Sequence, residues 1–210
     1  MHTPPRLLYV VDPMCSWCFG FAPALARVLE DLDPAVQVEL VAGGLAPDSD
    51  QPMAADTRAF VQQAWHAVTE RTGVEFDHRF WTECEPRRST YPACRAMVIA
   101  RAAGKGEAML AAIQRAYYRE AKNPSDVATL AALAGELGLD PVGFEAALAS
   151  PATEQQLQAD LARARSVGAS SFPSLALERD GGAELIASGC LGEAELRGIL
   201  GAAGLLRSPS

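Results

Sequence analysis

The feature that most constrains this chain is a pair of cysteines placed where a short apolar strand gives way to a helix. Residues 7–11 form a continuous apolar run of the kind found in buried sheets. Asp12 and Pro13 end the run, because proline cannot continue the ladder of a strand. Helical spacing follows at once, so Cys15 and Cys18 fall in a first helical turn, where free N–H groups and a partial positive charge favour a thiolate. Thiols three residues apart can also close a reversible disulfide.

Half of a zinc site and a purely structural pair are the alternative interpretations of these two cysteines. Zinc needs four ligands, and the sequence has no second close pair of Cys or His residues. The five cysteines are an odd number without the spacing of a disulfide framework, so most should be free thiols in a reducing compartment. We therefore expect a redox pair, no metal and no cofactor. Free thiols are also expected at Cys84, Cys94 and Cys190, with a second redox pair among them as the alternative.

Composition limits the partners that the chain can have. The net charge is −8, with no local run of Lys or Arg, which argues against non-specific binding to nucleic acid. No apolar stretch approaches the roughly 20 residues that span a bilayer, so we expect no membrane association. Residues 1–6 lack the features of a secretory leader, which predicts a cytoplasmic protein, with a mature secreted chain as the alternative.

The order of the predicted elements divides the chain into three stretches. Alternation over residues 36–42 predicts a second strand, parallel to the first. Helices are predicted over 54–72, from 89 or 90 to 103, over 107–121, from 125 to 138, from 140, and from 150 to 167. A hairpin with strands 174–178 and 184–188 and a helix over 192–200 complete the order. The boundaries that we predict are 1–50, an inserted helical domain at 51–155, and 156–210.

Three motifs carry a resemblance to a known family. They are Asp-Pro-Met-Cys-Ser-Trp-Cys-Phe-Gly-Phe at 12–21, Ser-Thr-Tyr-Pro-Ala-Cys-Arg-Ala at 89–96, and Ser-Phe-Pro-Ser-Leu at 171–175. Over nearly all its length the chain resembles the DsbA family of thiol-disulfide oxidoreductases, and within it the cytoplasmic FrnE-like branch. The resemblance implies an α/β thioredoxin fold, a central mixed sheet flanked by helices, with an all-helical domain inserted after the second strand.

The resemblance assigns roles to the residues of the first motif. It implies that Cys15 is the nucleophile and that Cys18 is the more buried resolving thiol, which attacks the mixed disulfide at Cys15. Ser16 and Trp17 would tune the redox couple. Ser16 could offer a hydroxyl donor to Cys15, and Trp17 offers an apolar surface that can also pack against the inserted lobe. For Asp12, capping or turn formation is favoured over a role as proton acceptor.

Two further groups of residues are implied as parts of the site. Pro173 matches the cis proline that faces the cysteines in thioredoxin-like proteins, which would allow Phe172 to pair with a substrate backbone. Ser89, Thr90 and Arg95 lie where related kappa-class isomerases have a helix start beside the active site. Backbone N–H groups there could bind glutathione. The alternative is a plain helix cap with a solvated Arg95.

The function predicted from the sequence is disulfide exchange with protein, peptide or small thiols, glutathione among them, through Cys15 and Cys18. The alternative is a glutathione-dependent small-molecule isomerase or transferase of the kappa-class or hydroxychromene-carboxylate isomerase type. Those relatives generally have serine at the position of Cys15 and no cysteine at that of Cys18. A monomer or a homodimer is expected.

Overall fold

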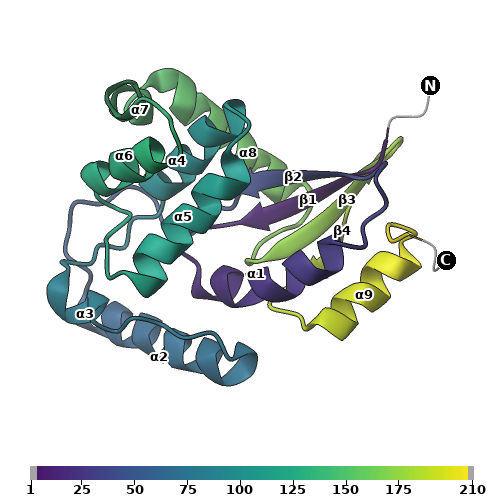
Figure 1. Ribbon diagram of the computed structural model, residues 1–210, viewed down its shortest axis with the longest axis horizontal. Coiled ribbons are helices and arrows are strands. Elements are labelled where there is room, and N and C mark those ends of the chain that lie inside the picture. Colours follow the sequence, from purple (N-terminus) through teal and green to yellow (C-terminus); the bar gives the residue numbers. More distant parts are fainter. Residues whose placement is uncertain (1–3, 208–210) are drawn as a thin grey trace.

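A computed structural model describes residues 4–207 as a mixed sheet of four strands covered by helices (Figure 1). The cytoplasmic location was predicted from residues 1–6, and residues 1–3 of that segment lie outside the described residues. The strands are β1 (Arg6–Val11), β2 (Gln37–Ala42), β3 (Ser174–Arg179) and β4 (Gly182–Ser188), in the order β2-β1-β3-β4. β1 pairs in parallel with β2 and antiparallel with β3, and β3 pairs antiparallel with β4. The predicted α/β fold class is confirmed.

Within residues 4–207 there are nine helices. They are α1 (Ser16–Leu29), α2 (Ala55–Thr72), α3 (Phe80–Glu83), α4 (Tyr91–Ala102), α5 (Gly106–Arg119), α6 (Val127–Glu136), α7 (Pro141–Leu148), α8 (Pro151–Ser166) and α9 (Glu193–Ala202). The short helix α3 was not predicted, and the other elements follow the predicted order. The predicted boundary after residue 155 cuts α8 after its first turn, and the division into domains stays a prediction. None of the described helices is long and apolar enough to cross a bilayer.

The strand that leads to the cysteines is buried on both faces. Leu7, Tyr9 and Val11 belong to a core shared with α1 and α9, whereas Leu8 and Val10 belong to a second core that includes Ala164 of α8. A strand covered on both sides must be apolar at every position, which explains the continuous run of residues 7–11. The end of β1 is therefore held firmly in the middle of the sheet.

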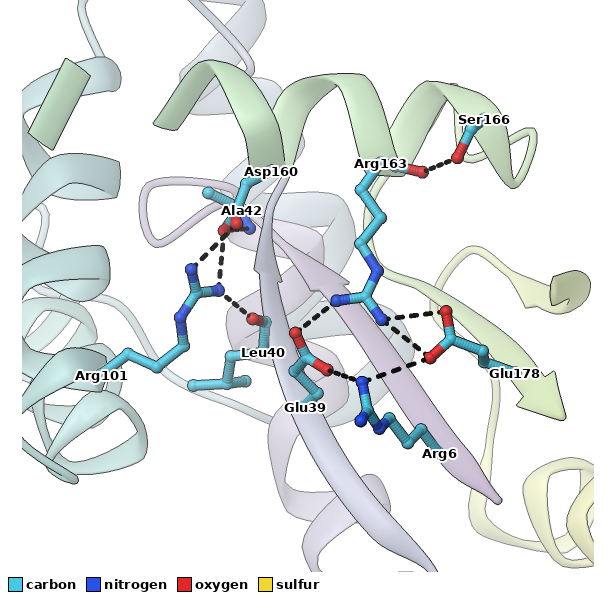
Figure 2. A network of polar contacts seen from close by, with 9 residues as sticks. All are labelled: Arg6, Glu39, Leu40, Ala42, Arg101, Asp160, Arg163, Ser166 and Glu178. Carbon is cyan, nitrogen blue, oxygen red and sulfur yellow. Dashed lines mark hydrogen bonds and ion pairs between the residues drawn. The ribbon is translucent and has the colours of Figure 1, made fainter. Parts of the chain in front are cut away.

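An ion pair attaches α4 and α8 to the outer strand β2 (Figure 2). Asp160 of α8 accepts hydrogen bonds from the N–H of Ala42 at 2.8 Å and from both terminal nitrogens of Arg101 at 2.8 and 2.9 Å. Arg101 of α4 also donates to the carbonyl oxygen of Leu40. Backbone groups at the edge of the sheet and two helices thus share one buried carboxylate.

The helices between β2 and β3 have a separate core rich in aromatic residues. Trp65 lies at its centre, with rings of neighbouring residues 4.8 to 5.9 Å from it, centroid to centroid; these rings belong to Phe76, His78, Phe80, Trp81, Tyr117 and Tyr118. Met14 and Phe19, which flank the two cysteines in sequence, also pack in this core. The cysteine turn therefore lies between the sheet and the helical part of the molecule.

Candidate active site

The two thiols lie at the start of α1, directly beyond the end of β1. Cys15 is the N-cap residue of the helix, with an extended backbone, and its N–H donates to the carbonyl oxygen of Asp12 at 3.0 Å. Both cysteines are free thiols. Cys15 keeps 7% of its surface exposed and Cys18 none, so a reactant from solvent would meet Cys15 first.

The surroundings of the two sulfurs separate their acidities. The side chain of Cys18 and the N–H groups of Cys18 and Trp17 hydrogen-bond to Cys15 and lower its pKa below the ordinary value of 9.0, although burial and the charge of Asp12 oppose the shift. Burial raises the pKa of Cys18 well above that value, and its hydrogen bond to Cys15 acts in the same direction. At neutral pH the favoured thiolate is therefore Cys15, supported by the first turn of α1.

The Phe172–Pro173 segment lies against Cys15. Its peptide bond is cis, and the carbonyl oxygen of Phe172 is 3.6 Å from Sγ of Cys15. The ring of Phe172 covers Gly43, where an added Cβ would come within 2.5 Å of it. The absence of a side chain at the end of β2 therefore lets this ring settle beside the cysteine turn.

Asp12 is a fully buried carboxylate that joins three segments around the cysteines. One oxygen accepts from the N–H of Met14 at 2.8 Å, which makes the turn that the sequence favoured. The other accepts from the N–H of Leu45 at 2.6 Å, from Oγ1 of Thr90 at 2.7 Å and from Sγ of Cys94 at 3.6 Å. Burial raises the pKa of Asp12, while these donors oppose the shift.

Asp12→Asn is expected to make the Cys15–Cys18 couple more oxidising. Without the negative charge the pKa of Cys15 should fall further, which stabilises the reduced form. The amide has one acceptor oxygen where the carboxylate has two, so it cannot accept from both Met14 and Leu45, which should cost about 1–3 kcal/mol of stability. A titration in glutathione redox buffers and the pH dependence of Cys15 alkylation would measure the redox effect.

Asp48→Asn is the matched control for this prediction, because Asp48 pairs with Arg95 through a half-exposed carboxylate and is not among the groups that shift the pKa of Cys15. If the potential and the alkylation profile of Asp12→Asn equal those of the control, the role of the buried charge is contradicted.

The role of Ser16 and Trp17 in tuning the redox couple stays a prediction, but the structure corrects the expected contact of Ser16 with Cys15. Ser16 is buried, and no hydrogen bond joins its hydroxyl to Cys15 among the described residues. Trp17 packs against the core shared with the sheet, to which α4, α5 and α8 also contribute residues, and not against the aromatic core around Trp65. Trp17, Phe21 and Ala24 recur at helical spacing on one face of α1, and that face is the one that covers the sheet.

Ser89, Thr90 and Arg95 make internal contacts. Thr90 is the N-cap residue of α4, but its side chain donates to Asp12 and does not cap the helix. The N–H groups of Thr90 and Tyr91 donate to the carbonyl oxygen of Ala46, so they are not free for a ligand.

Arg95 is not solvated as the alternative predicted, because its mostly buried side chain pairs with carboxylates of Asp48 and Glu154. Ser89 accepts from the N–H of Ser49. A glutathione contact at the three residues stays a prediction.

The other three cysteines lie apart from one another. Cys84 donates to the carbonyl oxygen of Ala121 at 2.9 Å, and Cys94 is buried beside Asp12. Cys190 follows β4, and its neighbour Gly189 donates to the carbonyl oxygen of Pro173 at 2.8 Å, a position that was not predicted. The predicted hairpin could have indicated this position, because in an antiparallel hairpin the end of the second strand lies beside the start of the first. All three are free thiols, as expected.

The sequence matches the model of a known protein family. The model of the DSBA-like thioredoxin domain matches residues 6–198. This chain belongs to that family. The match includes both cysteines, the helices between β2 and β3, and the Phe172–Pro173 segment. The family is one of oxidoreductases, whereas the FrnE-like branch within it stays a prediction.

Solved structures of DsbA-like proteins share the whole fold. A candidate protein disulfide isomerase from Nitrosomonas europaea is 32% identical, with a TM-score of 0.84 over 94% of this chain and 96% of that one. The cytosolic disulfide reductase DsbM from Pseudomonas aeruginosa is 30% identical, with a TM-score of 0.76 over 94% of this chain and 98% of that one. DsbM has also been solved with glutathione.

A curated relative has a different described role. The ClpXP adapter protein SpxH from Bacillus subtilis is 24% identical over 175 residues, which are 82% of this chain and 58% of that protein. The chain thus spans less than two thirds of the length of this relative.

Proposed function

We propose that the protein is a thiol-disulfide oxidoreductase that exchanges disulfides with protein or small thiols through Cys15 and Cys18. The observation that carries the proposal is the difference in acidity between two adjacent thiols at the start of α1. One sulfur is slightly exposed and favoured as a thiolate, and the other is buried and held as a thiol. A nucleophile and a resolving group need these opposite properties.

The reaction follows from this arrangement. The thiolate of Cys15 attacks one sulfur of a substrate disulfide, so a Cys15–substrate bond forms and the other substrate thiolate leaves and takes up a proton. Cys18 then loses its proton and attacks Sγ of Cys15. The Cys15–Cys18 disulfide forms, and the second substrate thiolate is released. In sum, the substrate disulfide is reduced by two electrons and the protein dithiol is oxidised.

The direction of net reaction that we propose is reduction or isomerisation in the cytoplasm. A reducing compartment keeps the dithiol form populated, and a dithiol donates electrons to substrate disulfides. The similarity to DsbM, described as a cytosolic disulfide reductase, supports this direction, and the DsbM structure with glutathione supports glutathione as a reducing partner. The hydrogen bond between Cys15 and Cys18 supports dithiol chemistry over the isomerase alternative, which needs no second cysteine. A monomer or homodimer stays a prediction.

A redox titration tests the proposal. After equilibration in buffers of reduced and oxidised glutathione, followed by alkylation and peptide mapping, Cys15 and Cys18 should lose their free thiols together and become linked to each other. In the reduced protein, alkylation of Cys15 should be half-maximal below pH 9.0, because its pKa is lowered and only the thiolate reacts. As the pH falls through that pKa, the rate should fall. Cys15 and Cys18 that stay reduced in every buffer would refute the proposal.

A further inference from the structure

A third thiol lies beside the segment that faces the reactive pair. Sγ of Cys15 is 3.6 Å from the carbonyl oxygen of Phe172. The next carbonyl oxygen, that of Pro173, accepts from the N–H of Gly189 at 2.8 Å. Cys190 follows Gly189 directly. Cys15 and Cys190 therefore flank the same two-residue segment, which directly precedes β3.

The ionisation of the thiols gives independent support for their proximity. Burial raises the pKa of Cys190, the Arg71 cation lowers it, and the charge of Cys15 raises it again. Burial also raises the pKa of Tyr9, and the charges of Cys18, Cys15 and Cys190 add to that shift. The Tyr9 hydroxyl is buried without a hydrogen-bond partner among the described residues. The charges of all three thiols therefore act on one buried hydroxyl, which is consistent with the backbone contacts that bring Cys190 toward Cys15.

Cys190 has room to react. It lies in the irregular segment between β4 and α9, is half-buried, and packs against the same core as Cys15 and Cys18. Nε of Arg71 donates to its carbonyl oxygen at 3.2 Å, which ties the segment to the end of α2. A cavity of about 420 Å³ adjoins it, lined also by Arg71 and Arg27. The cavity therefore leaves space on one side of Cys190 into which its side chain can move.

We propose that Cys190 is a second resolving thiol, which releases a bound thiol from a mixed disulfide at Cys15 when Cys18 does not. The inference rests on the proposed function, because Cys15 must first react with a disulfide. With glutathione disulfide, Cys15 becomes linked to one glutathione and the other leaves as a thiol. Cys190 then gives its proton to solvent, and its thiolate attacks Sγ of Cys15. The Cys15–Cys190 bond forms, the bond to glutathione breaks, and that glutathione thiolate takes up a proton. Two protein thiols are oxidised, and one glutathione disulfide is reduced.

Variants without the first resolving thiol test the inference. Cys18→Ser, Cys18→Ser/Cys190→Ser and Cys18→Ser/Cys84→Ser would be treated with glutathione disulfide, then quenched with acid and alkylated. Mass spectrometry would follow the glutathione adduct at Cys15. The adduct should disappear at least about tenfold faster in Cys18→Ser than in the variant that also lacks Cys190. A peptide that links Cys15 to Cys190 should appear at the same rate.

The Cys84 variant is the matched control, since Cys84 is also a partly buried thiol with a raised pKa but does not affect Cys15. It should behave as Cys18→Ser does. An adduct that persists equally with and without Cys190, or one that is released through Cys84 instead, would overturn the inference while the proposed function stands. If Cys15 acquires no glutathione in any variant, the proposed function itself fails.

Discussion

Cys15→Ser is expected to lower the rate of disulfide reduction by at least about 100-fold, to the level of the uncatalysed reaction. A serine hydroxyl does not ionise at neutral pH, so the hydrogen bonds from the first turn of α1 have no thiolate to stabilise. Cys18 cannot replace it, because burial leaves this thiol without exposed surface and raises its pKa. Insulin reduction with glutathione as the electron source would measure the loss.

Two companion variants show whether this loss belongs to the proposed reaction. Cys18→Ser/Cys190→Ser, which lacks both proposed resolving thiols, should still react with substrate at Cys15 and accumulate a mixed disulfide that gel electrophoresis detects without reductant. Cys84→Ser, which changes a thiol outside the site, should keep the full rate. Equal rates for Cys15→Ser and the unmodified protein would contradict the assignment of the nucleophile.

Arg101→Met is expected to lower the free energy of unfolding by about 3–5 kcal/mol. The change removes the cation that binds Asp160 through two hydrogen bonds, and the Asp160 side chain is only 10% exposed. The carboxylate would keep the N–H of Ala42 as its donor, which cannot replace a full charge. Urea denaturation at neutral pH, followed by circular dichroism, would measure the loss.

Arg163→Met is the matched control for this loss (Figure 2). Arg163 pairs with Glu39 and Glu178, whose side chains are about one third exposed, and Arg6 lies 3.8 and 3.5 Å from the same two carboxylates. Because water and a second cation remain, this change should cost only about 0–1 kcal/mol. Two variants of equal stability would contradict the view that burial of Asp160 determines the effect.

The sequence predicts the parts of the site that depend on local pattern. The apolar run before Asp12, the spacing of Cys15 and Cys18 and the helical period after them specify strand, turn and helix without reference to the rest of the chain. Burial of both faces of β1 accounts for the run, and the first turn of α1 accounts for the acidity of Cys15. The pattern of each feature can be recognised from residues that are neighbours in sequence.

Other parts of the site depend on partners that are distant in sequence. Thr90 has the side chain and the position of a helix cap, but its hydroxyl donates a hydrogen bond to Asp12, 78 residues away. The short helix α3 contributes Phe80 and Trp81 to an aromatic core around Trp65, and four residues are too few for a helical period. Cys190 reaches the site through strand register, which a single motif does not reveal.

The cysteine turn joins two hydrophobic interiors. Met14 and Phe19 belong to that of the helices, and Cys15 and Cys18 to that of the sheet. Detaching the helices would pull Met14 out of its packing and disturb the residue directly before the nucleophile. A copy that is partly unfolded would thus lose the backbone donors that lower the pKa of Cys15. Unfolding of either core should therefore raise the pKa of Cys15, so that a damaged protein reacts more slowly with disulfides and does not become an unspecific thiol reagent.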